Sequence, residues 1–442
     1  MRTKPVFPLL VSMSVPMMLS MLIQSLYNIV DSIYVSRLGT DALTAVSLAY
    51  PLQNAIVSVG VGIGVGIGSA VSIYLGSGDQ EKADLAATLG VILTFFHCIL
   101  FVLAGIFITR PFLHLFTDDP DILKDACDYT YIVLCLSFGA LLQLAFEKIF
   151  QSIGKMKITM YLLIVGCVIN IILDPVLIFG LLGFPALGVA GAAIATVIGQ
   201  ISAFLLYILV YVRKSYAVRI RLKYVRPDWK IIRRIYSVGI PSSIMMLLPS
   251  VLISLLNRIL ASFSDLYVAV LGVYFKLQTF IYMPANGIVQ GMRPILGYNY
   301  GAGEHARVRS TIRYSLGCAA AIMLIGTLLS LILPGQIFTL FDADAALMDA
   351  GVTALRIICL GFLVSSIGVI YAGAFEALGN GRDSLIISLL RQFVVTIPLS
   401  YMLSHFFGPV GVWIAFPAGE LCAAVVAFFL LKTYKKGAFS PF

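Results

Sequence analysis

Twelve long apolar stretches dominate the sequence, and they restrict what the chain can fold into. A helix that crosses a bilayer needs about 20 predominantly apolar residues, and every stretch is at least that long. The composition agrees, because 60% of the residues are hydrophobic and only 12% are charged. In lipid, the backbone polar groups of such a segment must bond to one another, which favours helices. We therefore predict an all-α membrane protein with twelve transmembrane helices, over residues 8–35, 42–75, 84–109, 126–151, 158–180, 186–212, 235–261, 266–297, 311–333, 348–378, 384–404 and 409–431.

The sequence is also duplicated in order. Residues of the first half recur in the second half at an offset of 220 to 225 positions, with six spans in each copy. The matches include Pro16 with Pro241, Tyr50 with Tyr274, and Gly188, Gly191 and Gly199 with Gly408, Gly411 and Gly419. The duplication predicts an N-lobe at residues 1–212 and a C-lobe at 235–442, each a six-helix bundle, joined by a basic cytoplasmic linker at 213–234.

The basic residues indicate how the chain is oriented. On the predicted topology, both termini and the loops on their side hold 20 Lys or Arg residues, whereas the opposite loops hold only Arg37, Arg110 and Lys124. Loops rich in Lys and Arg stay in the cytoplasm. We therefore expect a multi-pass protein of the cell membrane with cytoplasmic N- and C-termini. The net charge of +9 is mostly this bias, and its spread over many loops argues against a nucleic-acid partner.

No pattern of catalytic or metal-binding residues stands out. The seven cysteines lack paired spacing, and the four histidines are scattered along the chain. The closely spaced glycines of the second span form two helix stripes, which is typical of helix packing rather than of a phosphate-binding loop. One stripe holds Gly60, Gly64 and Gly68, and the other holds Gly62 and Gly66. We therefore expect neither an enzyme nor a bound metal or cofactor.

Two carboxylates inside predicted spans are the strongest functional candidates. Asp31 lies in the first span and Asp174 in the fifth, where a charged carboxylate is costly unless it faces a cavity or a partner. In the second copy, the aligned positions hold Leu255 or Leu256 and Ile397, so the acids occur in the first copy only. Polar neighbours at helical spacing extend the two candidates into a set: Gln24 and Tyr27 with Asp31, Asn170 with Asp174, and Thr196 in the sixth span.

A pair of acids in a medium of low dielectric should not both ionise easily, so such a pair can carry a proton. The neutral oxygens of Asn170 and Thr196 would equally suit a bare monovalent cation, because hard cations prefer oxygen ligands. The residues themselves leave H⁺ and Na⁺ both open. A purely structural role, in which the acids only hydrogen-bond to neighbouring helices, is a third possibility.

Other charges within spans have competing interpretations. Glu376 lies beside the inner loop that holds Arg382, so an inner-gate salt link and a role in ion coupling are both plausible. Arg258, Lys276 and Arg293 lie in the second copy. Snorkelling to the interface explains charges of this kind, but three cations that converged on one cavity would suit a phosphate-bearing ligand.

The chain resembles the multidrug and toxic compound extrusion (MATE) family over essentially its whole length. The marks are Pro16 with Asp31, the stretch from Asn170 to Pro175, and the stretch from Gly188 to Thr196. The resemblance implies two six-helix bundles related by pseudo-twofold symmetry, which form a V that opens alternately to each side. It also implies a cation or proton site at Asp31, Asn170, Asp174 and Thr196, and bending of the first helix at Pro16. The seventh span lacks the carboxylate that one branch of the family has there.

By this resemblance, we expect a secondary active multidrug efflux transporter that exports lipophilic and cationic drugs and dyes by antiport with H⁺ or Na⁺, as a monomer. Flexible methionines and aromatic faces suit varied organic cations. We therefore assign the substrate cavity by position to Gln24, Tyr27, Gln53, Met160, Tyr161, Asn257, Tyr274, Gln278 and Met283. The nearest alternative is a flippase for a lipid-linked or amphiphilic carrier. A membrane-embedded transferase and a channel fit the sequence less well.

Overall fold

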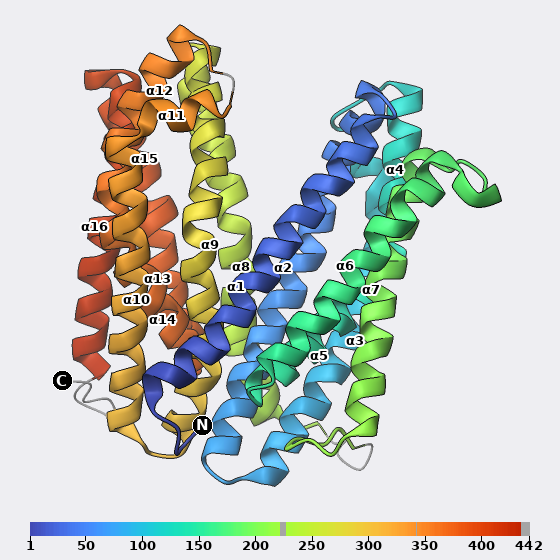
Figure 1. The fold of residues 1–442 in the computed structure, drawn as a ribbon, viewed down its shortest axis with the longest axis vertical. Coiled ribbons are helices and arrows are strands. Elements are labelled where there is room, and N and C mark those ends of the chain that lie inside the picture. Colours follow the sequence, from blue (N-terminus) through green and yellow to red (C-terminus); the bar gives the residue numbers. More distant parts are fainter. Residues whose placement is uncertain (222–226, 342, 435–442) are drawn as a thin grey trace. The chain divides into compact units, whose positions relative to one another are not determined.

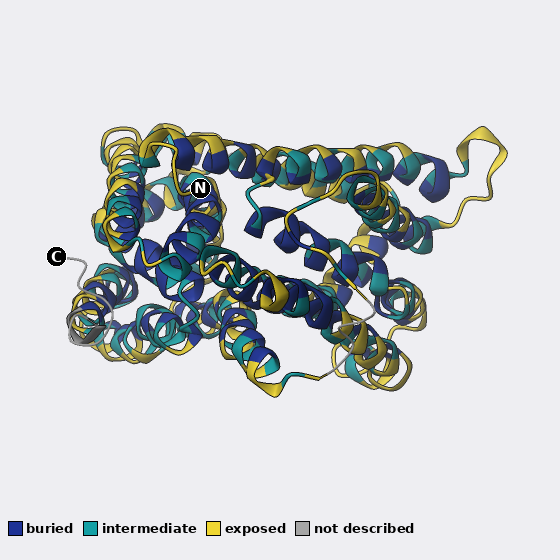
Figure 2. Cartoon of the chain, turned by 90° about the horizontal axis from the view of Figure 1, so that it is seen from below, coloured by how far each residue is buried: buried dark blue, intermediate teal, exposed yellow. Residues whose placement is uncertain are grey.

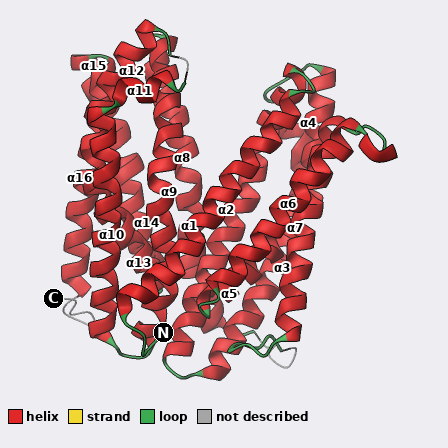
Figure 3. Cartoon of the chain, in the orientation of Figure 1, coloured by secondary structure: helices red, strands yellow, loops and turns green. Residues whose placement is uncertain are grey.

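The computed structural model of the protein describes residues 1–221, 227–341 and 343–434, and within these ranges the regular secondary structure is helical (Figure 3). Eleven helical segments are long and apolar enough to cross a membrane. Two further helices, α4 (Pro120–Cys135) and α5 (Phe138–Ser152), are bent by 44° at a short break and complete a twelfth span if they are counted together. The prediction of an all-α membrane protein with twelve transmembrane helices is confirmed.

The chain packs as two compact units. Unit I consists of Leu19–Ser243, and unit II consists of Met1–Met18 together with Ile244–Phe442. The helices α1 (Val6–Ser36) and α8 (Trp229–Ala261) each contribute residues to both units. In α1 the change of unit comes two residues after Pro16. The boundaries of the two units therefore differ from the predicted lobe boundaries, and the lobe boundaries stay a prediction.

Unit I is built around α2, which packs on α3, α4 and α5, while α6 and α7 run side by side (Figure 1). The glycines of α2 explain how closely its neighbours approach. A Cβ added at Gly60 would lie 2.7 Å from the Leu144 side chain of α5, and one added at Gly62 would lie 2.5 Å from the backbone nitrogen of Ser243 in α8. The two glycine stripes thus allow close packing against two different helices, α5 and α8, and helix packing is the role that their spacing predicts. The remaining helices of this unit are α2 (Thr40–Gly76), α3 (Gln80–Leu113), α6 (Met156–Phe179), the 3₁₀ helix η1 (Leu181–Gly183) and α7 (Gly188–Arg213).

The first part of the predicted linker packs on unit I. Val218 is 1% exposed, and the backbone N–H of Arg219 donates to Asp84 Oδ1 of α3 at 2.8 Å. The backbone N–H of Arg221 donates to Thr88 Oγ1 at 3.2 Å. The apolar Val218 side chain is therefore buried against the protein, and the neighbouring backbone is fixed to α3. Residues 222–226 of the linker, including Lys223, lie outside the described residues.

Unit II holds the second set of helices, in which two spans are interrupted. A 3₁₀ turn, η3 (Cys359–Gly361), separates α12 from α13, and a π-helical turn, η4 (Leu390–Val394), separates α14 from α15. Across both units, exposed residues lie on the outward sides of the helices (Figure 2), and many are large and apolar, as a bilayer requires. The helices of this unit are α9 (Asp265–Gly301), α10 (His305–Ile332), α11 (Pro334–Thr339), α12 (Ala345–Ile358), α13 (Phe362–Ala377), α14 (Gly381–Leu389), α15 (Thr396–Phe407) and α16 (Pro409–Tyr434).

Candidate functional site: an acidic cluster in unit I

Close packing of α6 against α7 brings the polar residues of the two helices together. Asn170 and Asp174 lie one turn apart on α6 and are 2% and 0% exposed. Gly199 of α7 faces them, because a Cβ added there would lie 3.1 Å from Asn170 Cβ and 2.9 Å from the Gly166 carbonyl oxygen. The absence of that Cβ lets the helices approach until Thr196 of α7 reaches Asn170.

A polar cluster brings side chains of three helices together at this place. The Asn170 amide lies with its Nδ2 3.4 Å from Asp174 Oδ1 and 3.3 Å from Thr196 Oγ1, and it donates to both. From α1, the Tyr27 phenol lies near Thr196. Asp31, also on α1, lies near Asp174. The structure therefore brings together Asp31, Asn170, Asp174 and Thr196, and their role in coupling stays a prediction.

The closeness of Asp31 and Asp174 determines what the cluster can do chemically. Two carboxyl groups near each other in a largely buried place do not both ionise easily, so such a pair can hold a proton. Three buried oxygens of the cluster have no hydrogen-bond partner among the described residues: Asp31 Oδ1, Asn170 Oδ1 and Asp174 Oδ2. Oxygens of this kind fit a proton or a small hard cation.

Tyr129 belongs to the surroundings of the acids, and sequence reasoning missed it. This α4 residue is 2% exposed, and its hydroxyl donates to Gln53 Oε1 of α2 at 3.3 Å. It lies within electrostatic range of both Asp31 and Asp174. Nothing in the sequence marks it among the 21 tyrosines, because its position depends on how α2 and α4 pack.

Comparison with known proteins assigns the chain to a family. The model of the MatE family matches residues 16–176 and 241–402, which is most of the chain. The chain belongs to the MatE family.

Relatives of this MatE protein cover nearly its whole length. The multidrug export protein MepA of Staphylococcus saprophyticus subsp. saprophyticus is 29% identical over 431 residues, which is 97% of this chain and 94% of the relative. MepA of Staphylococcus aureus is 26% identical over 432 residues, again 97% and 94%. A solved outward-facing structure of a multidrug resistance MATE family transporter has 26% identity and a TM-score of 0.90, and the match covers 99% of each chain. The MatE protein is accordingly a membrane transporter and not an enzyme.

The residues assigned to the substrate cavity of this MatE protein are divided between the units. Unit I holds five of them, of which Gln24 and Tyr161 are exposed, while Tyr27, Gln53 and Met160 are partly buried. Unit II holds Asn257, Tyr274, Gln278 and Met283. There, Tyr274 and Gln278 neighbour a buried polar group that includes Tyr282, whose hydroxyl donates to Ser365 Oγ at 2.7 Å. Their role as cavity residues stays a prediction.

The three cations considered for a flippase have different surroundings in unit II. Arg293 pairs with Glu376, and Lys276 is exposed on α9. Arg258 lines a pocket to which neither of the other two belongs. The flippase for a lipid-linked or amphiphilic carrier stays an alternative prediction. The predicted gate of Glu376 with Arg382 stays a prediction.

The structure shows a largely buried ion pair in unit II that the sequence analysis did not identify. Arg391 Nε lies 3.5 Å from Glu420 Oε1, with side chains 20% and 13% exposed. Arg391 stands in the π-helical turn η4, a feature that is frequent at functional sites. The sequence does not show this pair, since which charges meet depends on how η4 packs on α16.

Proposed function

We propose that this transporter exports varied drugs and dyes, chiefly lipophilic organic cations, by antiport with H⁺ or Na⁺, and that Asp31 and Asp174 bind the coupling ion. The observation that carries the proposal is that two carboxyl groups, one from α1 and one from α6, lie near each other in a largely buried cluster. Among the two ions, the proton is favoured, because two carboxyl groups close together in a largely buried place do not both ionise easily.

Charge balance explains how ion and substrate would compete. With a single shared proton, the pair carries one negative charge in a medium of low dielectric, which is costly. A second proton or a nearby organic cation neutralises that charge equally well. The two ligands therefore compete for the same electrostatic partner, so that binding of one favours release of the other.

Transport also requires that the two ligands prefer different conformations, since a ligand with equal affinity for both states shifts nothing. Asp31 stands on α1, whereas its partners Asn170, Asp174 and Thr196 stand on α6 and α7. A change in protonation therefore changes how α1 packs on the rest of unit I. Bending of α1 at Pro16 is the proposed mechanical response.

The site would act in a cell membrane with both chain termini on the cytoplasmic side, as the excess of Lys and Arg in the loops on that side predicts. Because the acidic cluster lies within a single unit of one chain, a monomer would suffice for transport.

The test is export of ethidium from proteoliposomes, driven either by a pH step or by a sodium step. We expect a pH step to drive export, and Asp31→Asn to lower the driven rate at least about tenfold, since it removes the exchangeable proton. The matched control is Asp41→Asn, which neutralises an exposed carboxylate in the first turn of α2 and should leave the rate unchanged. If only a sodium step drives export, the coupling ion is Na⁺ and not H⁺. Full proton-driven export by Asp31→Asn would remove Asp31 from the mechanism.

A further inference from the structure

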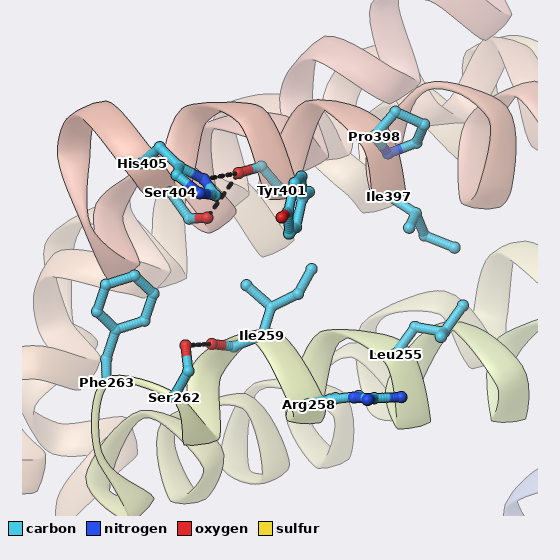
Figure 4. Close-up of a pocket in the computed structure, with 10 residues that line it drawn as sticks. All are labelled: Leu255, Arg258, Ile259, Ser262, Phe263, Ile397, Pro398, Tyr401, Ser404 and His405. Atoms are coloured by element: carbon cyan, nitrogen blue, oxygen red, sulfur yellow. Dashed lines mark hydrogen bonds between the residues drawn. The ribbon is translucent and has the colours of Figure 1, made fainter.

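Unit II contains a pocket at the place that corresponds, by internal duplication, to the acidic cluster of unit I. The pocket lies between the C-terminal part of α8 and α15 and has a volume of about 740 Å³ (Figure 4). Among its lining residues, Ile397 is aligned with Asp174, and Leu255 is one of the two residues, with Leu256, that can be aligned with Asp31. The second copy therefore keeps a cavity where the first copy has its acids, but with apolar side chains in their place.

The pocket also carries the opposite charge. Ten described residues line it, and they include the exposed guanidinium of Arg258 and the His405 imidazole but no carboxylate. Arg258 stays charged at any physiological pH. No ion pair joins it to an acid within the part of the chain that the structure describes. A cationic substrate would be repelled here, whereas an anion would be attracted.

The hydrogen-bonding groups of the pocket also favour an anion. The hydroxyls of Ser262 and Ser404 donate to carbonyl oxygens of their own helices, at 2.7 and 2.8 Å. These two hydroxyl protons are therefore not available to a ligand. The remaining donors of the pocket are those of Arg258 and Tyr401. His405 Nδ1 lies 2.9 Å from the Tyr401 carbonyl oxygen and donates to it, so that this proton is also used within the helix. Donors are what a carboxylate or a phosphate needs.

The rest of the lining is apolar, and Leu255 and Ile397 project into the space between the two helices in Figure 4. A volume of about 740 Å³ is typical of sites for drug-sized ligands. We infer that the pocket between α8 and α15 binds an amphiphilic anion, a molecule with one acidic group that meets Arg258 and an apolar chain that lies along Leu255 and Ile397. This site differs in unit, charge and ligand from the acidic cluster of the proposed function.

Photo-crosslinking tests the site directly. A fatty acid that carries a diazirine in its chain is irradiated with the full-length protein in maltoside micelles, and peptide mass spectrometry locates the label. We expect label on the segments 255–263 and 397–405. The fatty alcohol of equal length, which has the same chain without the acid, should label them at least about tenfold less, since a charge-assisted bond is lost.

Two variants and a control separate charge from folding. Arg258→Gln removes the charge and should lower the label at least about tenfold, and Leu255→Asp places an acid where the first copy has one and should abolish it. Arg309→Gln removes an exposed charge on α10 outside the pocket and should label like the wild type. Retained monodispersity in gel filtration shows that a variant is folded.

Competition identifies the source of the anion. Displacement of the label by unlabelled fatty acid assigns the pocket to free amphiphilic acids, and displacement by phosphatidylglycerol alone assigns it to a lipid headgroup; either result supports an anion site. Equal labelling by acid and alcohol, or undiminished labelling of folded Arg258→Gln, would overturn the inference. Because Asp31 and Asp174 lie in unit I, neither outcome bears on the export mechanism.

Discussion

Substitution of Gly62 by alanine tests the close packing of α2 on α8 in unit I. A Cβ at this position would lie 2.5 Å from Ser243 N and 2.7 Å from the Gly239 carbonyl oxygen. Both are backbone atoms, so no side chain can rotate away to make room. Ordinary contacts begin near 3.4 Å, and α8 would have to retreat by the difference, about 0.9 Å.

The control is Gly68→Ala on the same helix, where a Cβ would lie 3.6 Å from its nearest neighbour, the Lys148 carbonyl oxygen. Both variants gain the same helix propensity, about 0.5 to 1 kcal/mol. The difference between them therefore isolates the clash, which overpacking data place at about 1 to 3 kcal/mol. Thermal unfolding of the purified proteins, followed by size-exclusion fluorescence after heating, should show Gly62→Ala melting several degrees below Gly68→Ala. Equal melting temperatures, or a more stable Gly62→Ala, would refute the packing described for α2 and α8.

Two further predictions concern buried polar contacts. Asp84→Ala should free the linker segment 217–221, because Asp84 Oδ1 accepts the Arg219 N–H and its loss leaves that donor unpaired at a cost of about 1 to 3 kcal/mol. Hydrogen exchange at 217–221 should then be faster than in the wild type, and unchanged protection would count against the contact. Glu420→Gln should destabilise the protein by somewhat less than the about 3 to 5 kcal/mol of a fully buried pair, whereas Arg391→Met with Glu420→Leu should recover most of the loss. A double variant no better than the single one in thermal unfolding would show that the pair is not coupled.

Much of the architecture could be predicted from the sequence because the bilayer imposes one simple rule. Uninterrupted apolar stretches identified the spans, and glycine spacing identified the packing faces of α2. The breaks inside spans could not be predicted. The stretch 126–151 reads as continuous, yet the chain bends by 44° between α4 and α5, and the π-helical turn η4 likewise leaves no compositional trace. Such bends depend on tertiary packing.

The candidate site, like the fold, could be predicted from the sequence only in part. Asp31, Asp174, Asn170 and Thr196 stood out because polar groups in spans are costly, and the structure places them together. Tyr129 did not stand out, because a tyrosine in a span is unremarkable until the position of its neighbours is known. The pocket at Arg258 required the structure as well. The duplication had shown only that Leu255 or Leu256, together with Ile397, replaces the acids, and not that a cavity lies beside these residues.

The most direct test of the central claim is a count of protons released when ethidium binds to the purified protein in weakly buffered maltoside solution near neutral pH. If Asp31 and Asp174 exchange a shared proton for the cation, the wild type should release about one proton per bound ethidium, and Asp174→Asn should release none. Binding with no proton release by the wild type, or release that persists unchanged in Asp174→Asn, would contradict proton exchange at this pair.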